Sequence, residues 1–315
     1  MLAHSLRIVF MGTPDFAVAS LDALMKAGLQ VVAVITAPDK PAGRGLQPMQ
    51  SAVKKYALAH QIPILQPEKL KDPFFLQQLA SLNADLQVVV AFRMLPEAVW
   101  NMPPLGTINV HASLLPQYRG AAPIHRAIMN GEKTTGVTVF RLQHAIDTGG
   151  ILMQESVPIG EKQTVGELYE VLSRLGAELL VKTIHLLAVG KAQEQPQDTL
   201  IEGFLHTAPK IQSEDCRIDW NRSAQEIYNQ IRGLSPYPGA ITSLEGKTLK
   251  IFSATIRHET PSVVPGTMIT DGKSSLIFAC ADASIEVESL HLEGKKRMST
   301  EEFLRGYRLP KTPSL

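Results

Sequence analysis

The stretch Arg7-Ile-Val-Phe-Met11-Gly12-Thr13-Pro14-Asp15 is typical of a buried strand that turns directly into a helix. Residues 7–11 are almost continuously apolar, Thr13 is placed to cap a helix, and Pro14 suits the first helical position. An apolar stripe at helical spacing follows and ends at Gly28; it consists of Val18, Leu21, Leu24 and Met25. We therefore expect a strand, a tight turn and a helix to open the chain.

Strand patterns alternate with helical patterns through the first half of the chain. The further strand candidates are residues 31–35, 62–65, 87–91, 107–110 and 136–142. This order predicts an α/β fold with a doubly wound, mainly parallel, Rossmann-like sheet, whose ligands bind beyond the carboxyl ends of the strands. The turn at Gly12 lacks the G-x-G-x-x-G pattern, so we interpret it as a helix cap and disfavour a dinucleotide-dependent dehydrogenase.

Length and composition predict a two-domain cytoplasmic protein. The chain has 315 residues, of which 44% are hydrophobic, enough for two cores. The 31 Lys and Arg nearly balance the 30 Asp and Glu, so any nucleic-acid contact has to be local. Two unpaired cysteines and the lack of a ligand cluster argue against disulfides and metals. The sequence shows no signal segment and no apolar run of membrane length, so we expect a protein that is neither exported nor membrane-spanning. We also expect it to be a monomer.

Asn109 and His111 are the first candidates for chemistry. Thr107-Ile-Asn-Val-His111 alternates polar and β-branched residues, so a strand here turns both side chains to one face. Acyl transfer builds negative charge on a carbonyl oxygen, to which an Asn amide can donate. An imidazole can donate to the same oxygen or relay the proton of an attacking amine. Asp147, in Asp-Thr-Gly, supplies a carboxylate that could orient that imidazole.

Each of these residues also has a structural interpretation. A histidine at the end of a strand is often a hydrogen-bonded structural residue, and an aspartate before Thr-Gly is often a turn former. Residue type and spacing leave both interpretations open for His111 and Asp147.

The residues that follow His111 favour the catalytic interpretation. The segment His111-Ala-Ser-Leu-Leu-Pro-Gln-Tyr-Arg-Gly-Ala-Ala-Pro-Ile124 closely resembles the signature of the family that transfers formyl from 10-formyltetrahydrofolate. Its Arg-Gly-Ala-Ala-Pro-Ile version resembles the branch that acts on methionyl-tRNA. The resemblance covers nearly the whole chain, in order, through residues 10–17, 38–45, 147–152, 231–240 and 293–298.

The resemblance implies roles for particular residues. The catalytic Asn, His and Asp of the family fall on Asn109, His111 and Asp147. Its folate-contacting segment falls on Ser113, Leu114, Leu115 and Pro116. The co-substrate that it implies is 10-formyltetrahydrofolate, with no metal.

Residues 88–96, Val-Val-Val-Ala-Phe-Arg-Met-Leu-Pro, resemble the strand and loop that contact the pterin in the family, but depart from its pattern. The usual Ala-Tyr-Gly-x-Ile-Leu-Pro is one residue shorter here and lacks the Gly. We expect Phe92 and Arg93 to contact the folate. The absent Gly matters because it can supply a positive φ or a close backbone approach.

Residues 38–50 contain three prolines, two glycines, Lys40 and Arg44 without an apolar period, which predicts a long, mobile basic loop. The resemblance implies that this loop enters the tRNA acceptor stem, with Arg44 as the matching arginine and Lys40 beside it. A solvated loop whose charges bind nothing is the alternative.

A long helix and a polar connection follow the catalytic segments. Thr164-Val-Gly-Glu167 is a capping box, and an apolar stripe continues to about residue 189. Residues 190–198 are polar and lose the period, which indicates the start of a linker. We therefore expect a catalytic and folate-binding domain over residues 1–204 and a second domain over residues 205–315.

The second domain is expected to be a small OB-like β-barrel. One amphipathic helix at residues 224–232 precedes strand patterns at 249–252, 275–279 and 284–292. OB-like barrels commonly bind nucleic acid, and the resemblance implies tRNA contact. The basic clusters that suit it are Lys295, Lys296 and Arg297, then Lys247 with Lys250, and less clearly Arg305, Arg308 and Lys311.

The expected function is formyl transfer from 10-formyltetrahydrofolate to the α-amine of methionyl initiator tRNA. Two alternatives stay open: the acceptor is an amino-sugar nucleotide or glycinamide ribonucleotide, or the chain is an RNA-binding relative whose folate site has decayed. Folate binding separates the last alternative from the other two.

Overall fold

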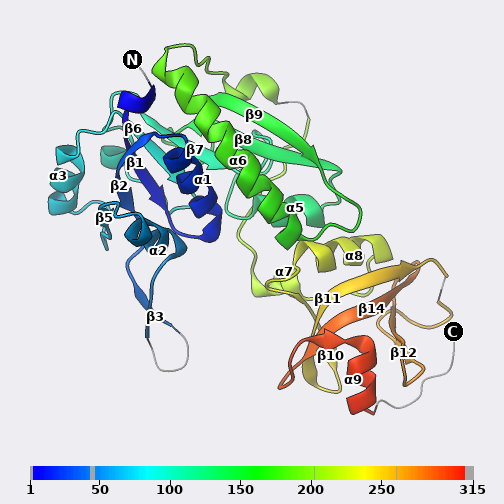
Figure 1. Cartoon of the computed structure of the whole chain (residues 1–315). Helices are drawn as coiled ribbons and strands as arrows, with labels where there is room; N and C mark the ends of the chain where they lie inside the picture. Colours follow the sequence, from blue (N-terminus) through cyan, green and yellow to red (C-terminus); the bar gives the residue numbers. More distant parts are fainter. Residues whose placement is uncertain (1–2, 43–46, 202, 260, 309–315) are drawn as a thin grey trace. The chain divides into compact units, whose positions relative to one another are not determined.

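The computed structural model describes residues 3–42, 47–201, 203–259 and 261–308, which form two compact units (Figure 1). The first unit comprises residues 1–120, 135–157 and 169–207. The second comprises residues 121–134, 158–168 and 208–315. None of the helices in the described parts of the chain combines the length and apolarity that crossing a bilayer demands.

A seven-stranded sheet organises the first unit. Its strands, in spatial order, are β5 (Ile64–Leu65), β2 (Gln30–Ile35), β1 (Arg7–Gly12), β6 (Leu86–Val90), β7 (Thr107–His111), β8 (Thr134–Arg141) and β9 (Ile151–Pro158). Neighbours from β5 to β7 pair in parallel, and β8 runs antiparallel to β7. The predicted mainly parallel α/β fold is confirmed, while β9 was not anticipated by the sequence analysis.

Helices cover both faces of this sheet. The helices of the first unit are α1 (Asp15–Lys26), α2 (Ala52–Ala59), α3 (Pro73–Ser81), α4 (Glu97–Trp100) and α6 (Val165–Ala188), with 3-10 turns at Ala3–Ser5 and Gln197–Leu200. On one face, α6 approaches Val110 so closely that a Cβ on Gly176 would lie 2.9 Å from it. On the other, Phe75 of α3 and Val99 of α4 pack with Val89 in one buried cluster. Since Asn109 lies opposite Val89 in the sheet, it points to this second face.

The start of α1 differs from the prediction by one residue. Pro14, not Thr13, occupies the N-cap, and no side chain of the local sequence caps the helix. The hydroxyl of Tyr169, on α6, accepts a hydrogen bond from the backbone nitrogen of Phe16 at 2.7 Å, and the two rings meet edge-on at 5.2 Å. A distant tyrosine therefore satisfies a donor that local residues leave open.

The loop predicted at residues 38–50 contains a short pair of strands that the sequence analysis did not anticipate. Residues Lys40–Ala42 (β3) and Gln47–Met49 (β4) pair as a short antiparallel hairpin. Asp39, before the hairpin, accepts from Lys54 Nζ at 2.5 Å and from Gln66 at 2.9 Å. Arg44 and the side chain of Lys40 lie outside the described residues.

The second unit is built on an antiparallel sheet. Its elements are α5 (Pro123–Met129), α7 (Ser213–Cys216), α8 (Ala224–Gly233), β10 (Ala240–Leu244), β11 (Lys247–Arg257), β12 (Met268–Thr270), β13 (Leu276–Ala279), β14 (Ser284–Leu292), β15 (Met298–Ser299) and α9 (Thr300–Gly306). The strand order is β10-β11-β14-β13-β12, with β15 on β14. Ile227 and Ile231 of α8 are buried in one core with Ile251 and Ile285 of the sheet. This sheet agrees with the predicted OB-like domain, and α8 spans the predicted helix.

Candidate active site

Strand β7 delivers two polar side chains to the edge of the sheet where its neighbours also end. Thr107, Asn109 and His111 alternate with the buried Ile108 and Val110, so they share one face. His111 is the last residue of the strand and is only 6% exposed. The site therefore lies at the carboxyl end of a central parallel strand, where ligands of open α/β sheets bind.

The imidazole of His111 is held by the backbone of a nearby turn. Its Nε2 lies 2.8 Å from the carbonyl oxygen of Tyr118. Because a carbonyl oxygen only accepts, Nε2 carries the hydrogen of this bond. The ring also meets Phe140 edge-on at 6.5 Å. Nδ1 is therefore the ring nitrogen left to exchange a proton with a substrate or with Asp147.

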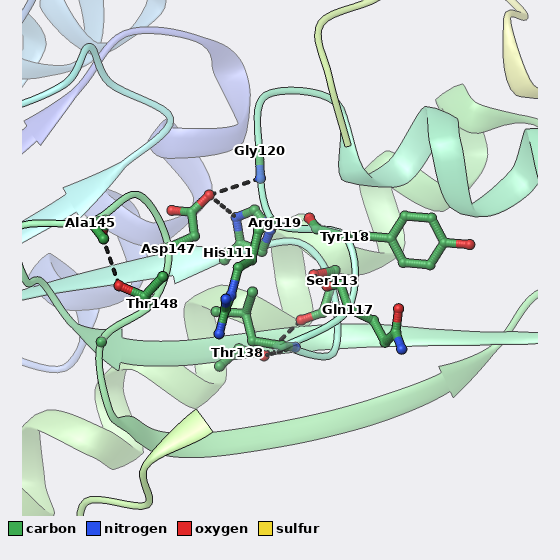
Figure 2. Close-up of polar contacts among 12 residues, drawn as sticks. His111, Ser113, Gln117, Tyr118, Arg119, Gly120, Thr138, Ala145, Asp147 and Thr148 are labelled. Atoms are coloured by element: carbon green, nitrogen blue, oxygen red, sulfur yellow. Dashed lines mark hydrogen bonds and ion pairs between the residues drawn. The ribbon is translucent and has the colours of Figure 1, made fainter. Parts of the chain in front are cut away.

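Asp147 faces that nitrogen from the segment between β8 and β9. Its Oδ2 lies 3.8 Å from His111 Nδ1 and accepts a hydrogen bond from the backbone nitrogen of Gly120 at 2.9 Å (Figure 2). Its backbone adopts φ 53°, a left-handed conformation that Asp tolerates better than most residues. Two residues on, a Cβ on Gly149 would lie 1.7 Å from the carbonyl oxygen of Arg141, so this segment needs glycine. The predicted His and Asp are thus brought together by a turn that the side chain of Asp147 helps to close.

Asn109, which is partly buried, contributes an amide to the same face. Among the described residues, no group hydrogen-bonds its Oδ1, although that oxygen is buried. A buried acceptor without a partner costs about 1–3 kcal/mol relative to a satisfied one. A substrate with an N–H group, such as an amine, can satisfy it. The Oδ1 of Asn109 can thus accept from an amine, and its Nδ2 can donate to a carbonyl oxygen such as that of a formyl group.

Residues 113–116, which the resemblance assigns to folate contact, are tightly fixed by their own surroundings. The Ser113 hydroxyl donates to the carbonyl of Gln117 at 2.7 Å, and Thr138 donates to the carbonyl of Ser113 at 2.7 Å. Thr138 also accepts from the backbone nitrogen of Leu115, whose carbonyl accepts from Gln154 at 2.6 Å. The peptide bond between Leu115 and Pro116 is cis, and Leu114 is the only partly exposed residue of the four.

The shortened loop after β6 is anchored by Arg93. Its guanidinium donates to the carbonyls of Glu68, at 2.8 Å, and Pro67, and lies 5.4 Å from the ring centre of Phe92. Burial lowers the pKa of Arg93. Ala91, at the start of this loop, adopts a positive φ of 47°, a conformation that the family's glycine could have supplied. The loop thus turns without a glycine, and Arg93 ties it to the segment before α3.

The basic clusters of the second unit are on its surface. Lys295 and Lys296 are exposed in the turn between β14 and β15, and Arg297 lies over the ring of Phe252, 4.4 Å from its centre. Lys250, by contrast, donates to the carbonyl of Pro238 at 2.9 Å. The cluster at residues 295–297 is therefore better placed than Lys250 to meet a solvent-side partner. Lys311 lies outside the described residues.

Sequence reasoning missed the residues that hold the site together. Tyr118, Gly120 and Thr138 act through the backbone or a buried hydroxyl. Gln197, 2% exposed, lies in the segment predicted to be a polar linker, yet it hydrogen-bonds the Asp147 turn. Nothing in the sequence distinguishes Gln197 from Gln193 and Gln195 of the same polar segment. No set of three or more His, Cys, Asp or Glu within the described residues is arranged to hold a metal ion.

Two family models match this chain over most of its length. The model described as formyl transferase matches residues 6–184, and the model described as formyl transferase, C-terminal domain, matches residues 210–308. The chain belongs to the formyl transferase family. Asn109, His111 and Asp147 all lie within the range that the first of these models matches.

Similar formyl transferases cover the whole chain. The methionyl-tRNA formyltransferase of Bacteroides fragilis is 51% identical over 315 residues, covering 98% of this chain and 97% of that protein. The methionyl-tRNA formyltransferase of Parabacteroides distasonis is 52% identical over 318 residues, covering 98% of each. This chain is an enzyme of that family.

Solved structures share the fold at much lower identity. An N-formyltransferase from Helicobacter canadensis, in complex with folinic acid and dTDP-3-aminofucose, superposes with a TM-score of 0.67 at 21% identity, covering 90% of this chain and 98% of that one. HypX from Aquifex aeolicus, in complex with tetrahydrofolic acid, gives a TM-score of 0.65 at 18% identity over 98% of this chain and 49% of its own. These likenesses support the architecture of this formyl transferase.

Proposed function

We propose that this formyl transferase moves the formyl group of 10-formyltetrahydrofolate to the α-amine of methionyl initiator tRNA, for translation initiation. The observation that supports the proposal is the 3.8 Å approach of Asp147 to His111, which shares one face of β7 with Asn109, in a chain 51% identical over 98% of its length to a methionyl-tRNA formyltransferase.

Asn109 serves both reactants in this proposal. Its open Oδ1 accepts an N–H of the attacking amine and so aims the nitrogen lone pair at the formyl carbon. Its Nδ2 donates to the formyl oxygen, which gains negative charge as the new bond between nitrogen and carbon forms. In other enzymes, removal of one such hydrogen-bond donor to an oxyanion lowers kcat by about 10²–10³-fold.

His111 and Asp147 manage the protons. In its doubly protonated form the imidazole of His111 donates from Nδ1 to the developing oxyanion, while Nε2 keeps its hydrogen bond to the carbonyl of Tyr118. Asp147, aimed by Gly120, accepts the proton that the amine loses and stabilises positive charge on the imidazole. As the tetrahedral species collapses, the bond between the formyl carbon and N10 of the folate breaks, and the proton passes to N10.

The two substrates are assigned to separate parts of the chain. Residues 113–116, with Phe92 and the loop anchored by Arg93, would hold the folate beside Asn109. Lys40, Arg44 and the cluster Lys295, Lys296 and Arg297 would contact tRNA. In this division residues 1–204 carry catalysis, folate binding and the tRNA contacts of Lys40 and Arg44, and residues 205–315 supply the other tRNA contacts. We expect the enzyme to act in the cytoplasm as a monomer, with no metal.

Formylation assays test this proposal directly. Purified methionyl initiator tRNA is incubated with 10-formyltetrahydrofolate and the enzyme, in parallel with methionyl elongator tRNA and an amino-sugar nucleotide, and His111→Ala serves as the control. Turnover on initiator tRNA alone, abolished in the variant, is expected. Turnover on the sugar but on neither tRNA would overturn the proposed acceptor.

Folate calorimetry separates a working enzyme from a decayed one. Saturable binding of the folate is expected, because the loop after β6 makes its turn at Ala91 although it lacks the glycine of the family pattern. Binding of tRNA without any folate binding would instead support an RNA-binding relative that has lost its catalytic site.

A further inference from the structure

Gln197 is a buried polar residue whose side-chain amide makes four hydrogen bonds near the candidate site. It lies on the 3-10 turn Gln197–Leu200, 50 positions after Asp147, and is 2% exposed. Its Nε2 donates to the carbonyl of Asp147 at 2.8 Å and to that of Gly149 at 2.7 Å. Its Oε1 accepts from Nε and Nη2 of Arg119, at 3.0 and 2.7 Å. All four hydrogen-bonding positions of the amide are occupied, which fixes its orientation.

The partner of Gln197 belongs to a tripeptide that holds the whole site. The carbonyl of Tyr118 accepts from His111, the guanidinium of Arg119 binds Gln197, and the backbone nitrogen of Gly120 donates to the Asp147 carboxylate. Gln197 therefore ties this tripeptide to the turn that carries Asp147. Gln197 binds the main-chain carbonyl of Asp147, while Gly120 binds the side-chain carboxylate of Asp147.

The residues before Gln197 are bound to the two strands that flank the Asp147 turn. Gln195 exchanges two backbone hydrogen bonds of 2.8 Å with Ile151, and Glu194 forms an ion pair with Arg141 at 3.0 Å. Further on, Thr207 forms a bridge with Arg119. The segment that the sequence presents as a linker is thus bound both to the strands that flank the Asp147 turn and to Arg119.

We propose that Gln197 is a positioning residue for formyl transfer, which sets the Asp147 carboxylate relative to Nδ1 of His111. This rests on the proposed roles of Asp147 and His111. Asp147 is held at φ 53° in a turn between two strands, and the 3.8 Å gap to His111 leaves its placement to groups other than the imidazole. Loss of the two amide donors frees the turn, and a displacement of about 1 Å at a reacting group costs on the order of 100-fold in rate.

Gln197→Glu tests the donors with little change in volume. The carboxylate still accepts from Arg119, but it cannot donate to the carbonyls of Asp147 and Gly149. We expect kcat to fall about 10- to 100-fold, with KM for tRNA and for folate unchanged. Gln197→Met, which removes the donors without adding a charge, should lower kcat likewise and keeps the test open if the glutamate variant folds poorly.

The matched control is Gln230→Glu in the second unit. Gln230 is 5% exposed, and its Nε2 also donates to two carbonyls, those of Asp215 and Arg217, at 2.8 and 2.9 Å. Thermal unfolding should show at least as large a loss of stability for Gln230→Glu, because Oε1 of Gln230 is buried without a partner among the described residues, whereas that of Gln197 accepts from Arg119. Only the substitution at position 197 should lower kcat.

A double-mutant cycle with Asp147→Ala separates positioning from general support of the fold. If Gln197 acts through the Asp147 carboxylate, Gln197→Glu lowers kcat no further in the Asp147→Ala background. Additive losses, or wild-type kcat in both Gln197 variants, would overturn the proposal. The wild type and His111→Ala, assayed alongside, report on the proposed function independently of this outcome.

Discussion

Nδ1 of His111 lies 3.8 Å from Oδ2 of Asp147, and that carboxylate oxygen accepts a hydrogen bond from the backbone nitrogen of Gly120 at 2.9 Å. The gap to the imidazole is longer than a hydrogen bond. The backbone therefore aims the carboxylate, and Asp147 acts on His111 through its charge. A reacting amine that enters the site meets an open Asn109 oxygen and a carboxylate whose orientation is already set.

Replacing Asp147 with alanine should lower kcat by at least about 100-fold, because a positioned acid or base typically contributes 10²–10⁴. The measurement is steady-state formylation of methionyl initiator tRNA. Glu155→Ala is the control: its carboxylate is 44% exposed and pairs with Lys182 at 3.8 Å, on a strand of the same unit. Full turnover by the Asp147 variant would contradict the mechanism.

Asn109→Ala and Asn109→Asp test the amide in two steps. Alanine removes the donor to the formyl oxygen and should lower kcat about 10²–10³-fold. Aspartate keeps the acceptor but replaces the donor with negative charge beside the developing oxyanion, so it should be at least as damaging. Single-turnover rates at saturating substrates give the comparison. An aspartate variant faster than the alanine variant would show that the acceptor oxygen of residue 109, rather than its N–H donor, dominates.

Arg93→Ala and Arg93→Lys test the anchor of the shortened loop. The guanidinium binds the carbonyls of Pro67 and Glu68 as a fork, and an ammonium group reproduces that geometry poorly. We expect a lower thermal midpoint and weaker folate binding in calorimetry for alanine, and only partial recovery for lysine. Unchanged folate affinity in Arg93→Ala would show that the loop does not depend on this anchor.

Arg126→Met tests the pH dependence of the second unit. Arg126 donates to both oxygens of Asp215, at 2.9 and 2.7 Å, and its hydrogen bonds lower the pKa of that carboxyl from the ordinary 3.8. A lowered folded-state pKa stabilises the fold above the ordinary value and loses this effect as pH falls through the lowered one. The variant should therefore be less stable than wild type by about 1 kcal/mol near neutrality.

As pH falls towards and below 3.8 this difference should shrink, because the unfolded chain protonates Asp215 near that value while the folded wild type does so only below its lowered pKa. Urea unfolding from pH 7 down to pH 3 measures it. Arg222→Met, which removes a pair whose side chains are 47% and 49% exposed, should show a smaller change throughout. A difference for Arg126→Met that does not vary with pH would assign its effect to other bonds of Arg126.

The features that the sequence predicted correctly are those with a local pattern. The period of two in residues 107–111 placed Asn109 and His111 on one face, as the strand does. The Thr164 to Glu167 capping box opens α6, where Glu167 accepts from the Thr164 backbone at 2.8 Å. Residues 284–292 form the strand β14 that their pattern indicated. In each case the signal and the structure lie within one turn or one strand.

Other features of the site depend on single groups, distant in the sequence, that no sequence pattern marks. Thr13 looked like the cap of α1, but the hydroxyl that binds the first turn belongs to Tyr169, 153 positions from Phe16. A backbone carbonyl holds His111, although every residue has one. Gln197 looked like a solvated linker residue until folding buried its amide against Asp147 and Arg119. The sequence by itself determined the α/β order, the OB-like second domain and which residues are candidates for the chemistry. Only tertiary structure decided which distant groups orient them, because a single amide or hydroxyl acquires its partner when the chain closes around it.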